Sequence, residues 1–120
     1  MFQKFEIHGV HANVDQALRD YTSKKIGGLD RYVPRHARNS AHAEVFLKET
    51  GKKDNHCRCE VTLYLPQETI VIKEDSINMY AAVDIAEAKL KQRLKKYKDL
   101  HANGRFRQHI SGRFRRQNRL

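Results

Sequence analysis

Apolar and polar residues alternate along four segments of the chain, and such alternation predicts half-buried β-strands. The segments are residues 2–9, 41–49, 56–65 and 68–74. In the third and clearest segment, one face carries Cys57, Cys59, Val61, Leu63 and Leu65, and the other carries Arg58, Glu60, Thr62 and Tyr64. Only Pro66-Gln67 separates the last two segments, which predicts a hairpin.

Two other segments carry apolar residues at intervals of three and four, which predicts helices. Between residues 11 and 32 these positions are Ala17, Leu18, Tyr21, Thr22, Ile26 and Leu29. We expect either Asn13, with Gln16 completing a capping box, or Asp15 to cap this helix. Gly27-Gly28 is expected to weaken or end it. Residues 33–40, around Pro34, are predicted to form a loop.

A longer helix is predicted from about Ile77 to Lys98, capped by Asp75 or Ser76. Its apolar stripe consists of Met79, Val83, Ala86, Leu90, Leu94 and Tyr97. Beyond Asn103-Gly104 the helical period stops.

These elements, taken in order, predict an α+β fold of the form β-α-β-β-β-α, with a four-stranded sheet that carries two helices packed on one face. The other face of the sheet, which includes Arg58 and Glu60, is expected to meet water. We expect residues 1–100 to form this single domain and residues 101–120 to form a flexible, basic C-terminal tail.

The positive charge of the chain is concentrated at one end. The formal net charge is +10, and residues 89–120 hold 12 of the 24 lysines and arginines but a single acid, Asp99. The preceding residues hold 12 basic and 13 acidic side chains, so they are close to neutral. Such an asymmetry is typical of a protein that binds a polyanion, and nucleic acid is the partner that we expect.

The long predicted helix carries basic residues on both sides of its apolar stripe. Lys89, Arg93 and Lys96 lie on one flank, and Lys91, Lys95 and Lys98 lie on the other. No acid occurs between Lys89 and Lys98 to form i,i+4 pairs with them. Because like charges this close together repel one another, the pattern indicates that phosphates neutralise them.

The segment GRFRQHISGRFRR, residues 104–116, repeats the unit Gly-Arg-Phe-Arg. Glycine and repelling arginines disfavour a helix here, so we expect a disordered arm in the free protein. Its phosphate contacts are expected to come from Arg105, Arg107, Arg113, Arg115 and Arg116. Phe106 and Phe114 can stack on unpaired bases.

The sequence contains no motif for a catalytic nucleophile, a phosphate-binding loop or paired catalytic carboxylates, so we expect neither enzymatic activity nor a cofactor. His56, Cys57 and Cys59 offer metal-ligand atoms, but the alternation turns both thiols toward the apolar face. We therefore expect buried cysteines and no metal site. Asp84 is expected to be a local charge partner.

Membrane insertion and secretion are not expected from this sequence. No run of 18 apolar residues is present, and charged residues interrupt the N-terminal stretch in a way that is not typical of a secretory signal. We expect a cytoplasmic protein that is a monomer when free.

The residues Met79 to Asp84, Met-Tyr-Ala-Ala-Val-Asp, together with Lys89-Leu90 and Leu94, resemble the family of ribosome hibernation-promoting factors and ribosome-associated translation inhibitors. The usual form in that family is a tyrosine, a small residue, Ala-Ile-Asp and then Lys-Leu. The first helix fits as well, through Ala17-Leu18-Arg19, Tyr21, Lys25-Ile26, Leu29 and Arg31-Tyr32. The resemblance covers about residues 2–100 and is to the short members. Ile77-Asn78 stands where the family often has an acidic pair.

This resemblance implies binding to ribosomal RNA at the decoding region of the small ribosomal subunit, and inhibition of translation by occlusion of the messenger and transfer RNA sites. By position it implies RNA contacts by Lys25, Arg31, Lys89, Arg93 and Lys96. The contacts expected of Lys91, Lys95 and Lys98 rest on charge alone. The alternative is a general double-stranded RNA-binding module, because that class runs α-β-β-β-α with a basic last helix.

Overall fold

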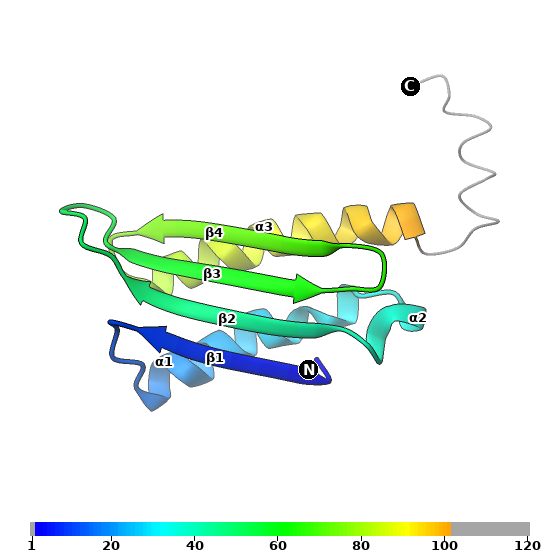
Figure 1. Ribbon diagram of the computed structural model, residues 1–120, viewed down its shortest axis with the longest axis horizontal. Helices are drawn as coiled ribbons and strands as arrows, with labels where there is room; N and C mark the ends of the chain where they lie inside the picture. The colour runs from blue at the N-terminus through cyan, green and yellow to red at the C-terminus, as the bar shows by residue number, and fades with distance from the viewer. Residues whose placement is uncertain (1, 102–120) are drawn as a thin grey trace, which may run out of the picture.

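The computed structural model describes residues 2–101 and shows a mixed sheet with its helices on one side (Figure 1). The elements in chain order are β1 (Lys4–Val10), α1 (Gln16–Thr22), η1 (Ser23–Gly27), η2 (Gly28–Tyr32), α2 (Arg35–Arg38), β2 (His42–Glu49), β3 (Cys57–Tyr64), β4 (Thr69–Ser76) and α3 (Met79–His101). The predicted α+β fold is thereby confirmed. The expected division into a domain of residues 1–100 and a tail of residues 101–120 stays a prediction, because residues 102–120 lie outside the described part of the chain.

The four strands lie in the sheet in the order of the sequence, β1-β2-β3-β4. β1 pairs with β2 in parallel, with Lys4 opposite His42, whereas the β2–β3 and β3–β4 pairs are antiparallel. A parallel pair needs a crossover connection, and the helical residues between β1 and β2 provide it. α1 and α3 consequently cover the same face of the sheet (Figure 1).

The core lies between this face of the sheet and the two helices. The predicted inward residues of β3, including Cys57 and Cys59, are all buried. They pack in one cluster with α3, whose predicted stripe of Met79, Val83, Ala86, Leu90, Leu94 and Tyr97 is also buried. The opposite face carries a half-exposed polar network in which Asp75 accepts hydrogen bonds of 2.7 Å from Arg58 and 2.8 Å from Lys52.

The first helical segment begins at Asp15, whose carboxylate accepts a hydrogen bond of 2.9 Å from the backbone N–H of Leu18. Of the two caps considered, Asp15 is therefore the one used. Gly27-Gly28 does not end the helical path, which continues as a π-helical turn, η1, and a 3₁₀ turn, η2. Two helical glycines cost about 2 kcal/mol in total. Burial of Ile26 and Leu29, which are 0% and 1% exposed, contributes about 1.5–3 kcal/mol for each side chain and outweighs this cost.

The predicted loop around Pro34 was wrong in part, because α2 forms one helical turn there. Pro34 is the N-cap residue of this turn, and its carbonyl accepts a hydrogen bond of 2.9 Å from the backbone N–H of Ala37. Ala37 is completely buried, and the Arg38 guanidinium donates a hydrogen bond of 3.0 Å to the Val33 carbonyl. The burial of Ala37 and the Arg38–Val33 hydrogen bond stabilise this turn. A segment of four residues is too short for a helical period to be recognised in the sequence.

The cap predicted for the long helix was also wrong. Asn78, rather than Asp75 or Ser76, caps α3, since its side-chain oxygen accepts a hydrogen bond of 2.8 Å from the backbone N–H of Ala81. Asp75 and Ser76 belong to β4, and α3 runs from Met79 to His101 instead of from Ile77 to Lys98. Asparagine is among the most favourable capping residues, so Asn78 provides a good helix start without an acidic pair.

Candidate nucleic-acid interface

Three basic side chains from two distant segments gather around the ring of Tyr32, in η2. The Arg31 guanidinium carbon lies 4.9 Å from the ring centroid, and the Lys91 and Lys95 amino nitrogens of α3 lie 5.2 and 5.9 Å from it. Arg31 also donates hydrogen bonds to the Gly28 carbonyl, at 3.1 Å, and to the Tyr32 hydroxyl, at 3.5 Å. The quadrupole of an aromatic ring attracts cations to its face, which fixes the positions of these charges.

The electrostatics of Tyr32 reflect this surrounding charge. Hydrogen bonding to Arg31, followed by hydrogen bonding to Lys91, lowers the pKa of the Tyr32 hydroxyl. Within residues 2–101, none of Arg31, Lys91 and Lys95 has a carboxylate oxygen within 4.0 Å of its nitrogens. We call Arg31, Tyr32, Lys91 and Lys95 the Tyr32 cluster; its positive charge is available to an anion.

The other flank of α3 differs from the sequence-based expectation, because acids outside the helix pair with two of its basic residues. The Lys89 amino group lies 3.1 Å from a carboxylate oxygen of Glu74, in β4. The Arg93 guanidinium lies 3.5 Å from Glu68, in the turn between β3 and β4. Lys89 and Arg93 therefore have acidic partners, although α3 itself supplies none between Lys89 and Lys98. Both basic side chains are about half exposed, and such pairs are weak enough to exchange partners.

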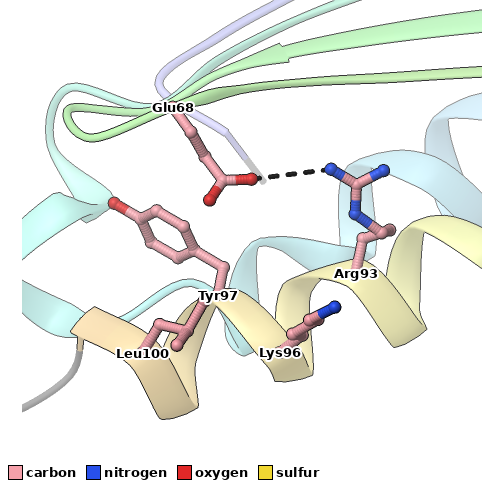
Figure 2. A pocket seen from close by; sticks show the side chains of 5 residues that line it. All are labelled: Glu68, Arg93, Lys96, Tyr97 and Leu100. Carbon is pink, nitrogen blue, oxygen red and sulfur yellow. Dashed lines mark ion pairs between the residues drawn. The ribbon is translucent and has the colours of Figure 1, made fainter.

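Figure 2 shows the hollow that lies on this flank, which is lined by Arg93, Lys96, Tyr97 and Leu100 of α3 and by Glu68, with Arg93 and Glu68 joined as an ion pair. Its volume is about 360 Å³. The Tyr97 hydroxyl hydrogen-bonds with the side-chain oxygen of Gln67, and its ring lies against His101, with centroids 4.7 Å apart. Within the described residues, Lys96 and Lys98 have no carboxylate oxygen within 4.0 Å.

A second hollow, of about 430 Å³, lies between the first helical segment and α3. Its lining residues are Tyr21, Lys24, Lys25, Leu29, Arg31 and Glu87. The Lys25 amino group lies 3.7 Å from Glu87 and 3.6 Å from Asp84, and these acids, Glu87 most strongly, raise the pKa of Lys25. The ion pair with Lys25 confirms the predicted role of Asp84 as a local charge partner, and Asp84 also accepts a hydrogen bond from Tyr21.

The predicted site residues of the domain thus lie on one helical surface, although they differ in their surroundings. Lys25, Lys89 and Arg93 are paired with acids, whereas Arg31, Lys91, Lys95, Lys96 and Lys98 have no such pair within the described residues. Sequence analysis assigned no site role to Tyr32, which meets Lys91 and Lys95 because η2 lies against α3, or to Lys24, which lines the second hollow. The predicted contacts of Arg105, Arg107, Arg113, Arg115 and Arg116 lie outside the described residues.

Among residues 2–101, no helix combines the length and the apolar character that a membrane crossing requires.

The chain is similar to known proteins over most of this domain. It is 33% identical over 95 residues to a protein from Staphylococcus aureus (strain COL) named Ribosome hibernation promotion factor, and the match covers 79% of this chain and 48% of that protein. The chain thus spans about half the length of this curated relative.

Two solved structures share the fold. The first is the Protein Y N-terminal domain of Thermus thermophilus, with a TM-score of 0.66 and 31% identity over 81% of this chain and 99% of that one. The second is a ribosomal subunit interface protein from Coxiella burnetii, with a TM-score of 0.65 and 28% identity over 80% of this chain and 98% of that one.

A family model agrees with these likenesses. The model for the Sigma 54 modulation protein / S30EA ribosomal protein family matches residues 5–102, which include nearly all of β1 and every later strand and helix of the described fold. The resemblance to the hibernation factors is confirmed, and the chain belongs to the Sigma 54 modulation protein / S30EA ribosomal protein family.

Proposed function

We propose that this protein is a ribosome hibernation factor that binds ribosomal RNA at the decoding region of the small subunit. Bound there, it inhibits translation by occupying the space of messenger and transfer RNA, and it acts without catalysis or a cofactor. A ribosome-bound role also places the protein in the cytoplasm. Membership in a ribosome-associated family supports the ribosomal partner, and the helical surface described above supports contact with RNA.

The single observation that carries the RNA contact is the Tyr32 cluster. Three cations from η2 and α3 are held within 6 Å of one ring and lack a carboxylate partner in the described part of the domain. Like charges brought this close repel one another, and a phosphate group relieves the repulsion while releasing counterions from the RNA. Lys98 extends the flank of α3 that carries Lys91 and Lys95, and Lys96 lies on the other flank beside Arg93.

Cosedimentation with purified small subunits over a series of salt concentrations tests the proposal. If about six phosphates are contacted, log affinity falls with a slope of roughly −5 against log salt concentration. A triple variant, Arg31→Gln, Lys91→Gln and Lys95→Gln, is expected to weaken binding and to reduce the magnitude of the slope by about 2–3. A nearly flat salt response would contradict phosphate contact altogether.

A matched control separates specific contacts from net charge. The control variant Lys4→Gln, Lys53→Gln and Lys73→Gln also loses three positive charges, but from exposed positions outside the helical surface. It is expected to bind nearly as well as the unmodified protein. Equal weakening in both variants means that net charge alone attracts the RNA.

Naked duplex RNA, added as a competitor, tests the alternative of a general duplex-binding module. That alternative predicts that duplex RNA displaces the small subunit from the protein.

A further inference from the structure

Three side chains with metal-ligating atoms converge where β2 and β3 meet at their hairpin end. Glu49 is the last residue of β2 and lies directly opposite Cys57, the first residue of β3. His56 immediately precedes Cys57. One ligand atom from each of Glu49, His56 and Cys57 lies within 4.8 Å of the other two.

The hairpin backbone holds these residues in place. The backbone N–H of Thr50 donates a hydrogen bond of 2.7 Å to the His56 carbonyl, which closes the loop directly beside the cluster. Asn55 has a φ of 51°, in the left-handed region that asparagine tolerates better than most residues. The chain therefore reverses just before His56 and brings its imidazole alongside Glu49 at the end of β2.

The two cysteines differ in their neighbours, although both are buried as the sequence predicted and burial raises the pKa of both thiols. Cys59 is completely buried, and its burial raises the pKa of its thiol to about 12. Cys57 lies at the rim of the core, where its sulfur is 3.7 Å from a Glu49 oxygen and 3.9 Å from the Ile77 carbonyl. Among the described residues, Cys57 belongs to a group of three metal-ligating side chains and Cys59 does not.

The distances approach those of a tetrahedral zinc site. With metal–ligand bonds of about 2.0–2.3 Å, tetrahedral geometry separates neighbouring ligand atoms by about 3.3–3.5 Å. In the structure, the Cys57 sulfur lies 3.7 Å from Glu49 Oε2, and the His56 Nε2 nitrogen lies 3.9 Å from Glu49 Oε1. The two contacts involve different oxygens of the exposed Glu49 carboxylate, and each ligand atom of the group lies within 4.8 Å of the others, so small side-chain adjustments would be needed for all three to meet one ion.

Although the sequence led us to expect no metal site here, we propose from this geometry that Glu49, His56 and Cys57 form a binding site for Zn²⁺ or a similar borderline-soft divalent ion, with a fourth coordination position open to solvent. Thiolate and imidazole select such ions over Mg²⁺ and Ca²⁺, which prefer oxygen ligands. On binding, the Cys57 thiol releases its proton to solvent and the sulfur forms the metal bond. The ion would fasten the end of the β2–β3 hairpin beside the residues that lead into α3.

A second cluster provides an internal comparison. Glu6, His42 and Glu44 also bring their ligand atoms within 4.8 Å of one another, on the open face of the sheet. This cluster lacks sulfur, so the two positions give different spectra with the same ion. A metal that binds there cannot produce a sulfur-to-metal charge-transfer band.

Titration of the reduced, full-length protein with Co²⁺ as a spectroscopic substitute for Zn²⁺ tests the proposal. One equivalent of Co²⁺ is expected to produce a sulfur-to-cobalt charge-transfer band in the near ultraviolet, and Zn²⁺ is expected to remove it by displacement. Cys57→Ser should abolish the band, whereas Cys59→Ala should retain it. His56→Ala, at a half-exposed position that does not endanger folding, should weaken affinity by at least about tenfold.

The outcomes divide cleanly between support and contradiction. A charge-transfer band that depends on Cys57 and His56 supports the site. A rise in melting temperature with added Zn²⁺ that is lost in Cys57→Ser and in His56→Ala supports the coupling of metal binding to the fold. Co²⁺ binding without the band, or with a band that Cys59→Ala removes, overturns the proposal. Metal affinity that His42→Ala removes and His56→Ala leaves unchanged assigns the ion to the other cluster and likewise overturns it.

Discussion

The hydroxyl of Tyr21 donates a hydrogen bond of 2.5 Å to the Asp84 carboxylate and thereby joins α1 to α3. The same carboxylate oxygen lies 3.6 Å from the Lys25 amino group. The Tyr21 ring also meets the Tyr80 ring edge to face, with centroids 5.0 Å apart. These contacts fix the spacing of the two helical segments that carry the basic surface.

The Tyr21–Asp84 hydrogen bond is expected to make stability depend on pH in the alkaline range. The bond to Asp84 is the largest cause that raises the pKa of Tyr21. The folded protein therefore retains the phenol proton after the unfolded chain has begun to lose it, near pH 10. The stabilisation is complete below that pH and is lost as the pH rises through the folded-state pKa.

Urea unfolding of the wild type and of Tyr21→Phe checks this expectation at neutral and at alkaline pH. The variant should be less stable at neutral pH, and the difference should shrink above about pH 10. Tyr64 and Tyr97, whose pKa values are also raised, are present in both proteins and so cancel in the comparison. A difference that does not change with pH would exclude the hydrogen bond as its origin.

Asp75 should govern the acid side of the stability profile. Hydrogen bonds from Arg58, and then from Lys52, lower the pKa of its carboxyl well below the ordinary value. Its stabilisation is therefore present above the unfolded-state pKa of about 3.9 and is lost as the pH falls toward the folded-state value. Asp75→Asn is expected to cost about 1 kcal/mol at neutral pH.

Thermal unfolding at neutral and acidic pH measures this effect. The destabilisation by Asp75→Asn should diminish below about pH 4, where the unfolded wild-type chain becomes protonated. Asp54→Asn, at an exposed loop position, is the control and should change stability little at either pH. Equal effects of the two substitutions would mean that net charge, and not the Arg58–Asp75–Lys52 network, sets the acid profile.

The two flanks of α3 should contribute unequally to ribosome binding. Lys91→Gln with Lys95→Gln removes charges without a carboxylate partner in the described domain, whereas Lys89→Gln with Arg93→Gln removes charges already partly neutralised by Glu74 and Glu68. We expect the first pair to weaken small-subunit binding and translation inhibition more. Both variants should change the free energy of unfolding by less than about 1 kcal/mol.

Inhibition of a cell-free translation reaction, with binding measured in parallel, makes this comparison. Circular dichroism and thermal unfolding first establish that both variants are folded. Unaltered inhibition by both folded variants would remove α3 from the binding surface. A larger loss from Lys89→Gln with Arg93→Gln would mean that the RNA displaces Glu68 and Glu74 and uses the freed cations.

Removal of residues 102–120 tests the expected role of the arginine-rich segment. A chain that ends at His101 should keep its melting temperature, because the glycines and mutually repelling arginines of residues 104–116 disfavour a packed helix. Its ribosome binding should be weaker and less sensitive to salt, since six arginines are lost. A melting temperature lowered by several degrees would show that the segment packs on the domain, and no change in either property would show that it is dispensable.

The strands could be predicted closely from sequence because each has one buried face. Alternation placed all four within about two residues of their observed bounds. The helical segment from Ser23 to Tyr32 and the single turn of α2 were harder, since burial of Ile26, Leu29 and Ala37 overrides the local preferences of glycine and proline. Such burial depends on contacts in the assembled core, and the local sequence pattern carries no information about those contacts.

The same limit applies to the candidate interface. Charge spacing along α3 identified both basic flanks, because neighbouring positions on one helix follow from helical geometry alone. The ion pairs with Glu68 and Glu74, and the gathering of Arg31, Lys91 and Lys95 at Tyr32, depend on which strand and which turn lie beside the helix. These contacts join residues far apart in the sequence, and only the tertiary structure brings them together.

The parallel pairing of β1 with β2 has a consequence for the order in which the sheet assembles during synthesis. β2, β3 and β4 follow one another through short connections and can pair as soon as each emerges, whereas β1 has no partner until the whole helical crossover and β2 have been made. Closing that long segment is the slow, entropically costly step. β1 is therefore expected to remain without a strand partner until β2 has been made.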